Sequence, residues 1–233
     1  AMTKSTAIMG GITKEMKQEM KEAALAVSSV SATGPTEVAE AFYFLASAGL
    51  DAKQSIAALP AVEKFATAGA FNMAKATELL ADSQSALGLR SADAAQNMTN
   101  MVRVSDVLVE AANKSNASVE QFAKSLTTKS ASAMRIMNIS VEEGVAVLAA
   151  YADQGIKGEM AGEKLSILLR ELQKGVREHS EEWKRMGLSV YDAQGKFLGV
   201  SNIVRQVNDR LAGLSDQQKN AAFSLLGFRA ESQ

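Results

Sequence analysis

The residues best suited to acid–base chemistry are the only histidine and a few neighbouring carboxylates. His179 lies in the charged segment REHSEEW, where it could act as a general base beside acidic residues. The adjacent pairs Glu142–Glu143 and Glu181–Glu182 would point to different sides of a helix, so neither pair converges on one substrate. We therefore expect His179 to be a solvated surface residue, and we expect no catalytic residue in this chain.

Other chemical motifs are missing from the sequence. There is no cysteine, no GxSxG, no HExxH, no phosphate-binding loop and no dinucleotide fingerprint after a strand. The pair Gly10–Gly11 lacks the lysine that a phosphate site needs. We therefore expect no metal and no cofactor. Cleavage of a glycosidic bond would need two facing carboxylates, and this alternative stays open because spacing alone does not show which carboxylates face each other.

Composition and charge favour a helical protein without a polyanionic partner. The 233 residues carry 25 Lys and Arg against 26 Asp and Glu, so there is no basic excess and we expect no specific nucleic-acid binding. No apolar run approaches the roughly 18 residues of a membrane span. Aromatic residues make up 5% of the chain, prolines number two, and alanine is frequent. This composition predicts an all-α fold.

The spacing of apolar residues and of helix signals predicts a string of short helices. Between Ile12 and Val30 apolar residues recur every three or four positions, as on one face of a helix. Gly49 and Gly155 stand where helices should end, each followed by an aliphatic residue. Four helix starts carry a capping box: Asp51 with Gln54, Ser118 with Gln121, Ser140 with Glu143, and Ser215 with Gln218. We expect helices over residues 12–31, 35–48, 51–68, 71–87, 91–114, 118–136, 140–153, 159–175, 178–186, 201–213 and 215–226.

The break at Gly34–Pro35 divides the predicted helices into two parts. Residues 1–34 would form an N-terminal amphipathic helix, and residues 35–233 would form one helical domain. Because the breaks between helices are frequent, we expect short antiparallel helices packed into a compact domain, with a radius of gyration of about 17–18 Å. The segments 36–50 and 140–156 resemble each other, which indicates either an internal duplication or two unrelated alanine-rich helices.

One segment departs from the helical pattern. In LSVYDAQGKFLG, apolar residues flank a polar turn in which Asp192 can bond to the turn backbone and Gly195 can take a positive φ. The segment predicts a small β-hairpin near residues 188–198. We expect Trp183, the only tryptophan, to anchor the preceding helix to this hairpin.

A pair of small residues heads a leucine stripe in the predicted helix 159–175. Ala161, Leu165, Leu168 and Leu172 follow each other at spacings of four, three and four, so they share one face. Gly162 inside a helix costs up to about 1 kcal/mol relative to alanine, so a steric need explains its presence. The pattern predicts a close helix crossing at this step.

In its order of motifs the chain resembles the core region of phage tail tape-measure proteins of the TP901 type. That region shows a G-I-x-G-x-x-A-G step, a leucine-rich helix, a segment L-G-[LV]-x-V-x-D-x-x-G, and a final G-x-x-A. The matching residues are Gly155, Ile156, Gly158, Ala161 and Gly162, then Leu165, Leu168 and Leu172, then Gly187, Val190, Asp192 and Gly195, and finally Gly227 with Ala230. The family commonly has threonine after the Ala-Gly pair, whereas this chain has Glu163.

The resemblance implies a structural role in a phage or prophage tail. Tape-measure proteins lie in the lumen of the growing tail, scaffold the tail tube, set its length and leave during DNA ejection. The implied partners are the tail tube protein, tail assembly chaperones and tail-tip or baseplate proteins, and self-association is a further option. The implied locations are the virion tail lumen and, during assembly, the host cytoplasm. A helical host-interaction or membrane-active protein and a tail-associated cell-wall hydrolase segment are the alternatives.

The frequent helix breaks also bear on how such a chain could measure length. A measuring rod needs long uninterrupted helical periodicity, whereas here a glycine, a proline or a new cap intervenes every ten to twenty residues. The chain also begins with Ala-Met and ends with RAESQ directly after the last predicted helix. We therefore expect a folded piece of a longer polypeptide rather than the rod itself.

Overall fold

The computed structural model describes residues 2–31 and 33–228, which form thirteen α-helices and one π-helical turn. Their bounds are α1 Met2–Met9, α2 Lys14–Val30, α3 Pro35–Ser47, α4 Ala52–Gly69, α5 Met73–Ala86, α6 Ala94–Lys114, α7 Val119–Ser125, η1 Leu126–Ser130, α8 Ala131–Ile136, α9 Val141–Asp153, α10 Gly158–Glu178, α11 Ser180–Arg185, α12 Val200–Leu211 and α13 Asp216–Leu225. The predicted all-α class is confirmed.

Most helix starts and stops lie where the sequence signals predict them. Capping boxes are complete at Asp51–Gln54, Ser118–Gln121 and Ser215–Gln218. Gly49 and Gly155 follow their helices with φ of 86° and 83°, a conformation that glycine adopts without strain. Two features were not predicted from the sequence, the short first helix α1 and the π-helical turn η1 within the predicted helix 118–136.

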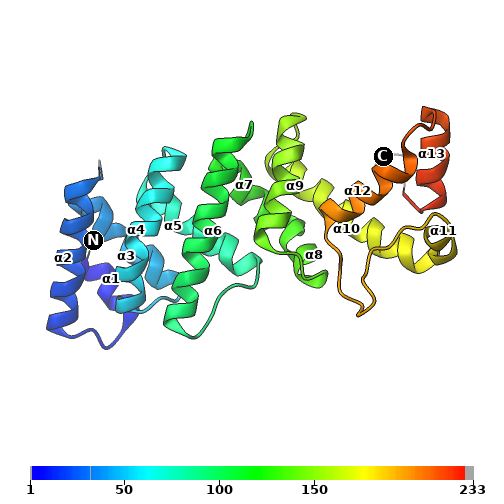
Figure 1. Cartoon of the computed structure of the whole chain (residues 1–233). Helices are drawn as coiled ribbons and strands as arrows, with labels where there is room; N and C mark the ends of the chain where they lie inside the picture. Colours follow the sequence, from blue (N-terminus) through cyan, green and yellow to red (C-terminus); the bar gives the residue numbers. More distant parts are fainter. Residues whose placement is uncertain (1, 32, 229–233) are drawn as a thin grey trace.

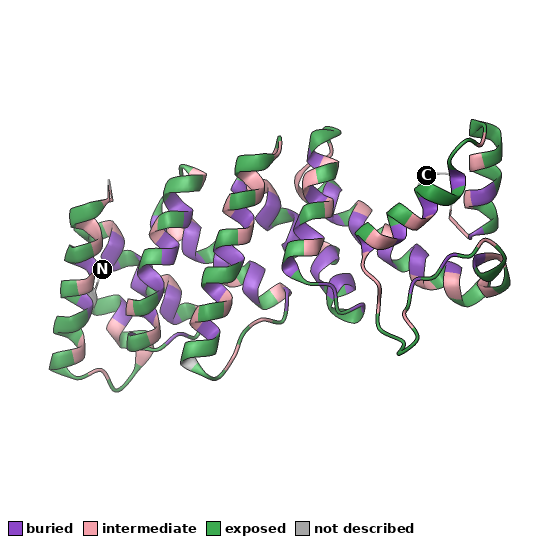
Figure 2. Ribbon diagram, in the orientation of Figure 1, coloured by how far each residue is buried: buried purple, intermediate pink, exposed green. Residues whose placement is uncertain are grey.

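The helices up to α10 alternate between two layers. In one layer α2 packs on α4, α4 on α6, and α6 on α9; in the other α1 packs on α3, α3 on α5, α5 on α7 and η1, and these on α10. Consecutive helices along the chain contact each other across the layers, as α3 does with α4 and α5 with α6. Figure 2 shows the buried residues on the faces where the layers meet, with exposed residues outside. One hydrophobic core, from Met20 to Leu226, runs through the whole arrangement.

The two-layer arrangement makes the molecule elongated, which corrects the predicted compact domain. The helices form a row from α1 and α2 at one end to α11 and α13 at the other (Figure 1). The accessible surface is 12020 Å², whereas a compact protein of 24.6 kDa would expose about 10,100 Å². The helix breaks are where the sequence predicts them, but each helix packs on its neighbours in the row instead of around one centre.

The spacing of the helices is that of a two-helix repeat. The helices α2, α4, α6 and α9 begin at Lys14, Ala52, Ala94 and Val141, so 38, 42 and 47 residues separate their starts. Repeats of about 33–47 residues with two helices each are typical of helical solenoids. The similar segments 36–50 and 140–156 form α3 and α9, which lie in opposite layers. They do not hold equivalent places in the array, so the arrangement favours two independent alanine-rich helices over a duplication.

The predicted hairpin near residues 188–198 is wrong as a strand pair, although its turn is present. Tyr191 and Phe197 form a single antiparallel bridge, and no strand is assigned within residues 2–31 and 33–228. Asp192 Oδ1 accepts hydrogen bonds from the backbone N–H groups of Gln194 and Lys196, at 2.9 and 2.8 Å. The turn is satisfied locally, and an isolated two-stranded ribbon this short gains too little to extend.

The last three helices lie beyond the two layers, where α11 packs on α10 and α12 packs on α9. Trp183 on α11 is buried, and its Nε1–H donates a hydrogen bond of 3.1 Å to the Leu226 carbonyl at the end of α13. Its ring also lies 6.2 Å from that of Phe228. Trp183 therefore anchors α11 to the end of α13, and its carbonyl also accepts a hydrogen bond of 2.9 Å from the N–H of Leu188, where the predicted hairpin begins.

Candidate functional site

The predicted helix-crossing residues lie where α10 meets α7 and η1. Gly162 is buried there, and a Cβ atom added to it would collide with the backbone carbonyl oxygen of Ser125 and with the Thr128 hydroxyl. A backbone carbonyl cannot move aside as a flexible side chain can, so only glycine fits at this contact without a shift of one helix.

Three hydroxyl groups fix the backbone that Gly162 contacts. The hydroxyls of Thr128 and Ser130 both donate to the Ser125 carbonyl, at 2.8 and 2.5 Å. The Ser125 hydroxyl in turn donates to the Gly158 carbonyl in the first turn of α10, at 2.6 Å. Thr128 has non-helical dihedral angles inside the π-helical turn (φ −78°, ψ −138°). The hydroxyls thus satisfy backbone groups that the irregular turn leaves free, and they tie it to α10.

The residues of the predicted leucine stripe on α10 do not all face the same helices. Ala161, Leu165 and Leu172 are buried, while Leu168 is half-buried and lines a small apolar hollow between α10, α12 and α13. Leu169, which the stripe did not include, is fully buried. The apolar face of α10 is therefore wider than one stripe, because it packs on the array on one side and on α12 on the other.

A second close approach lies at the other end of α10, between Gly227, which the motif order predicts, and Gly175, which it does not. A Cβ atom on Gly175 would lie 2.5 Å from the Leu226 carbonyl oxygen. A Cβ atom on Gly227 would lie 2.7 Å from His179 Cδ2 and 3.2 Å from Gly175 Cα. His179 is half-buried at this junction and not fully solvated as predicted. The predicted helix 159–175 ended at Gly175, whereas α10 continues to Glu178 and so places this glycine within the helix.

The remaining predicted turn residues lie at separate places along the chain. Gly155, Gly158, Gly187 and Gly195 all have positive φ, between 60° and 83°, and a Cβ atom on any of them would meet nothing within 4 Å. They serve local chain reversals and do not gather with Gly162. Ala230, the last residue of the motif set, lies outside the described residues.

Glu143 behaves differently from a capping-box residue. Ser140 accepts a hydrogen bond from the Glu143 N–H as predicted, but the Glu143 carboxylate does not return to Ser140. It accepts instead from the N–H of Val200, the first residue of α12. Glu143 thus links α9 to the C-terminal helices, a long-range contact that the local signal could not show.

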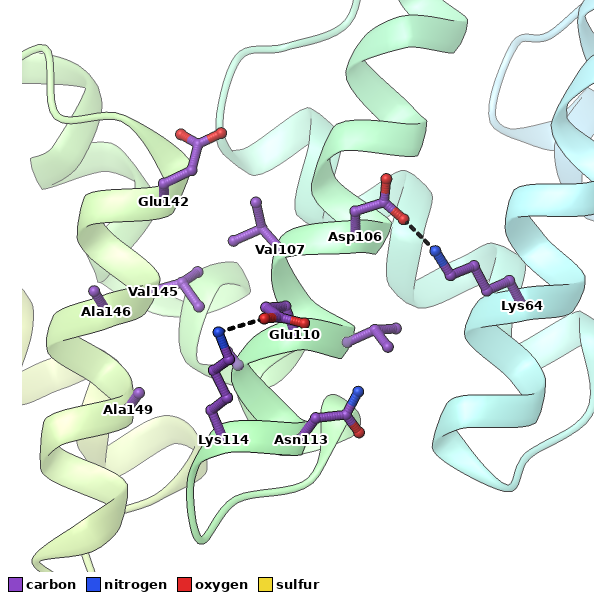
Figure 3. Close-up of a pocket in the computed structure, with 12 residues that line it drawn as sticks. Lys64, Asp106, Val107, Glu110, Asn113, Lys114, Glu142, Val145, Ala146 and Ala149 are labelled. Atoms are coloured by element: carbon purple, nitrogen blue, oxygen red, sulfur yellow. Dashed lines mark hydrogen bonds and ion pairs between the residues drawn. The ribbon is translucent and has the colours of Figure 1, made fainter.

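A hollow lined by residues of α4, α6 and α9 lies on one face of the layer that contains these helices (Figure 3). Its volume is about 720 Å³. Its apolar floor is formed mainly by Val107, Ala111, Val145 and Ala149. We call this hollow the α6–α9 groove.

Ion pairs border the groove. Lys64 on α4 pairs with Asp106 on α6 at 2.7 Å, and Glu110 pairs with Lys114 within α6 at 2.5 Å, both drawn in Figure 3. Each of these side chains is more than half exposed, so each pair is screened by water.

A third ion pair at the border joins α6 to α9. The Arg103 guanidinium donates two hydrogen bonds of 2.6 Å to the Glu142 carboxylate. These hydrogen bonds hold the pKa of Glu142 at about 2, below its usual 4.5, although partial burial opposes the shift. Because the pair is bidentate, it fixes the orientation of the two side chains beside the groove.

The described part of the chain offers neither a metal-binding cluster nor a membrane-crossing helix. Within residues 2–31 and 33–228, no cluster of three or more His, Cys, Asp or Glu side chains could hold a metal ion. Among the helices of the same residues, none has both the length and the apolar character needed to cross a membrane.

Comparison with known proteins identifies the family. The family of phage-related minor tail proteins matches residues 21–227. The chain is 29% identical over 219 residues to a tape measure protein of Pneumococcus phage Dp-1, a match that covers 94% of this chain and 18% of that protein. It is 25% identical over 206 residues to a probable tape measure protein of Escherichia phage P2, covering 88% and 23%. No solved structure matches the chain.

These matches confirm the resemblance to phage tail tape-measure proteins that the motif order indicates. The chain spans about a fifth of the length of these two relatives. The match to the family covers nearly the whole chain, from the middle of α2 to the end of α13. The chain belongs to the family of phage-related minor tail proteins.

Proposed function

We propose that this chain is the folded segment of a tape measure protein, with a structural role and no catalytic role. The observation that carries the proposal is the match over 94% of the chain to a protein named tape measure protein. In this proposal the parent protein scaffolds the tail tube, sets tail length and is released at DNA ejection. It lies in the tail lumen of the virion and in the host cytoplasm during assembly.

Within that protein, the segment acts in assembly or docking and the measuring length lies elsewhere. The elongated two-layer array supports this division, because its helices pack side by side and do not extend end to end (Figure 1). The candidate partners are the tail tube protein, tail assembly chaperones and tail-tip or baseplate proteins. In this proposal residues 1–34 are the N-terminal helical part, packed through α1 and α2 on α3 and α4, and residues 35–233 are the core domain.

An in-frame deletion in the phage that encodes the chain tests this proposal. Codons 35–228 are removed from the parent gene, and tails are measured by electron microscopy. We expect tails to be absent or aberrant, since an assembly element is lost. A control removes an equal number of codons from a long, unbroken helical stretch of the same gene and should give shorter tails. Intact tails shortened by about 290 Å, the length of 194 residues as one helix, would contradict the proposal.

A further inference from the structure

We propose that the α6–α9 groove binds an amphipathic α-helix of another polypeptide, through a short neutral apolar stripe. The groove has a volume of about 720 Å³ and runs between two helices of one layer. Figure 3 shows Val107 and Val145 pointing toward each other across it, with charged side chains around them. The proposal concerns a surface that the family match does not assign, and it does not depend on the proposed function.

The shape of the floor fits two turns of a helix. On α9 the lining runs from Glu142 to Ala149, and on α6 from Asp106 to Lys114. At 1.5 Å per residue these stretches are about 10 and 12 Å long, close to two helical turns of 5.4 Å each. Ala146 and Ala149 keep the α9 wall low, so the backbone of an incoming helix can approach closely.

The lining backbone excludes a peptide that binds by β-strand addition. Every lining residue belongs to α4, α6 or α9, and none lies on a strand. A peptide bound as a strand needs a free sheet edge for its backbone hydrogen bonds, and these helices offer none. A helix satisfies its own backbone groups and can present only side chains to the apolar floor.

The charges around the groove select a neutral stripe and exclude nucleic acid. The lining contains Lys64 and Lys114 against three carboxylates, so it carries no basic excess for a phosphate backbone. The three carboxylates are Asp106, Glu110 and Glu142, and each already has a cation at 2.5–2.7 Å. A charged residue on the incoming stripe would have to break one of these pairs, whereas an aliphatic residue would not.

The size of the groove favours a single helix over a second folded copy of the chain. Stable protein–protein interfaces bury about 1,200–2,000 Å² in total, which two turns of helix alone do not provide. The interaction we infer is therefore local and reversible, with its energy concentrated in the few aliphatic side chains that reach the floor.

A designed peptide tests the proposal directly. The probe is a fluorescein-labelled helical peptide of about 18 residues, with leucine at i, i+3, i+4 and i+7 and with alanine and glutamine elsewhere. The control peptide has the same composition, with its leucines distributed around the helix. Binding to the chain is followed by fluorescence anisotropy. We expect the striped peptide to bind at least about tenfold more tightly than the control peptide.

Two matched variants locate the binding site. Ala146 is exposed and lines the groove, so Ala146→Trp fills the groove without displacing buried atoms. Ala26 is exposed within α2 and does not line the groove, so Ala26→Trp adds the same ring elsewhere. We expect Ala146→Trp to weaken binding at least about tenfold and Ala26→Trp to leave it unchanged, with circular dichroism confirming that both fold.

Three results would overturn the proposal. The first is that the unmodified chain does not bind the striped peptide, and the second is that Ala146→Trp binds it as well as the unmodified chain does. The third comes from sedimentation of the chain alone. Self-association that Ala146→Trp abolishes would assign the groove to a second copy instead of a helix from another polypeptide.

Discussion

The contact at Gly162 predicts that the smallest possible enlargement of this residue destabilises the protein. In Gly162→Ala the new methyl group would collide with the Ser125 carbonyl and the Thr128 hydroxyl, and the carbonyl belongs to a backbone held by three hydroxyl groups. Overpacking of this kind costs about 1–3 kcal/mol. Alanine regains about 1 kcal/mol of helix propensity, so the net loss of stability is up to about 2 kcal/mol.

Gly144 in α9 provides a matched control. It is also a buried glycine inside a helix, but a Cβ atom there would meet only the end of the flexible Met134 side chain. Both alanine variants gain the same helix propensity, so the difference between them isolates the collision with the backbone. We expect Gly162→Ala to be about 1–3 kcal/mol less stable than Gly144→Ala.

Thermal unfolding followed by circular dichroism at 222 nm measures this difference. For a chain of this size, 1 kcal/mol shifts the midpoint by about 2–4 °C, so Gly162→Ala should melt at least about 2 °C below Gly144→Ala. Gly162→Leu should melt lower still, since it adds three more carbons at the same contact. If Gly162→Ala melts at or above Gly144→Ala, the close crossing of α10 with α7 and η1 is refuted.

Two further predictions concern an ion pair and the shape of the molecule. The folded pKa of Glu142 is about 2, below its ordinary 4.5, so its pairing with Arg103 stabilises the fold above pH 4.5 and is lost as the pH falls toward 2. Because the pair is about half exposed, Glu142→Gln should cost only about 0.5–1 kcal/mol at pH 7 in urea unfolding and almost nothing near pH 2; a cost that does not vary with pH would contradict this. In small-angle X-ray scattering, the radius of gyration should exceed the about 17–18 Å of a compact domain, and a value within that range would contradict the elongated array.

The features that the sequence predicts correctly are those decided by neighbouring residues. Helix starts at Asp51, Ser118 and Ser215 depend on a side chain three residues away, and the ends at Gly49 and Gly155 depend on one backbone conformation. The turn around residue 192 is likewise satisfied within four residues. Such signals can be read without knowing what the helix packs against.

The features that the sequence does not predict depend on residues far apart in the chain. The Glu143 carboxylate does not cap its own helix, because it accepts a hydrogen bond from the N–H of Val200, 57 residues away. Gly175 meets the Leu226 carbonyl, and no local pattern marks that partner. The π-helical turn is a partial exception, since LTTKS gathers hydroxyl residues that compete with regular helix hydrogen bonds. The two-layer arrangement likewise depends on contacts between helices far apart in the chain, such as α4 with α6 and α7 with α10.

The geometry of the array also explains why a segment of this kind is a poor measure of length. Neighbouring helices in one layer lie about 8–10 Å apart, and each step along the layer uses 38–47 residues. The array therefore lengthens by about 0.2 Å per residue, whereas a single α-helix lengthens by about 1.5 Å per residue. To span the same distance, an array of this kind would need several times as many residues as a single α-helix. What the array gains is a broad face with defined hollows, such as the α6–α9 groove, and such a face suits docking and assembly better than measurement.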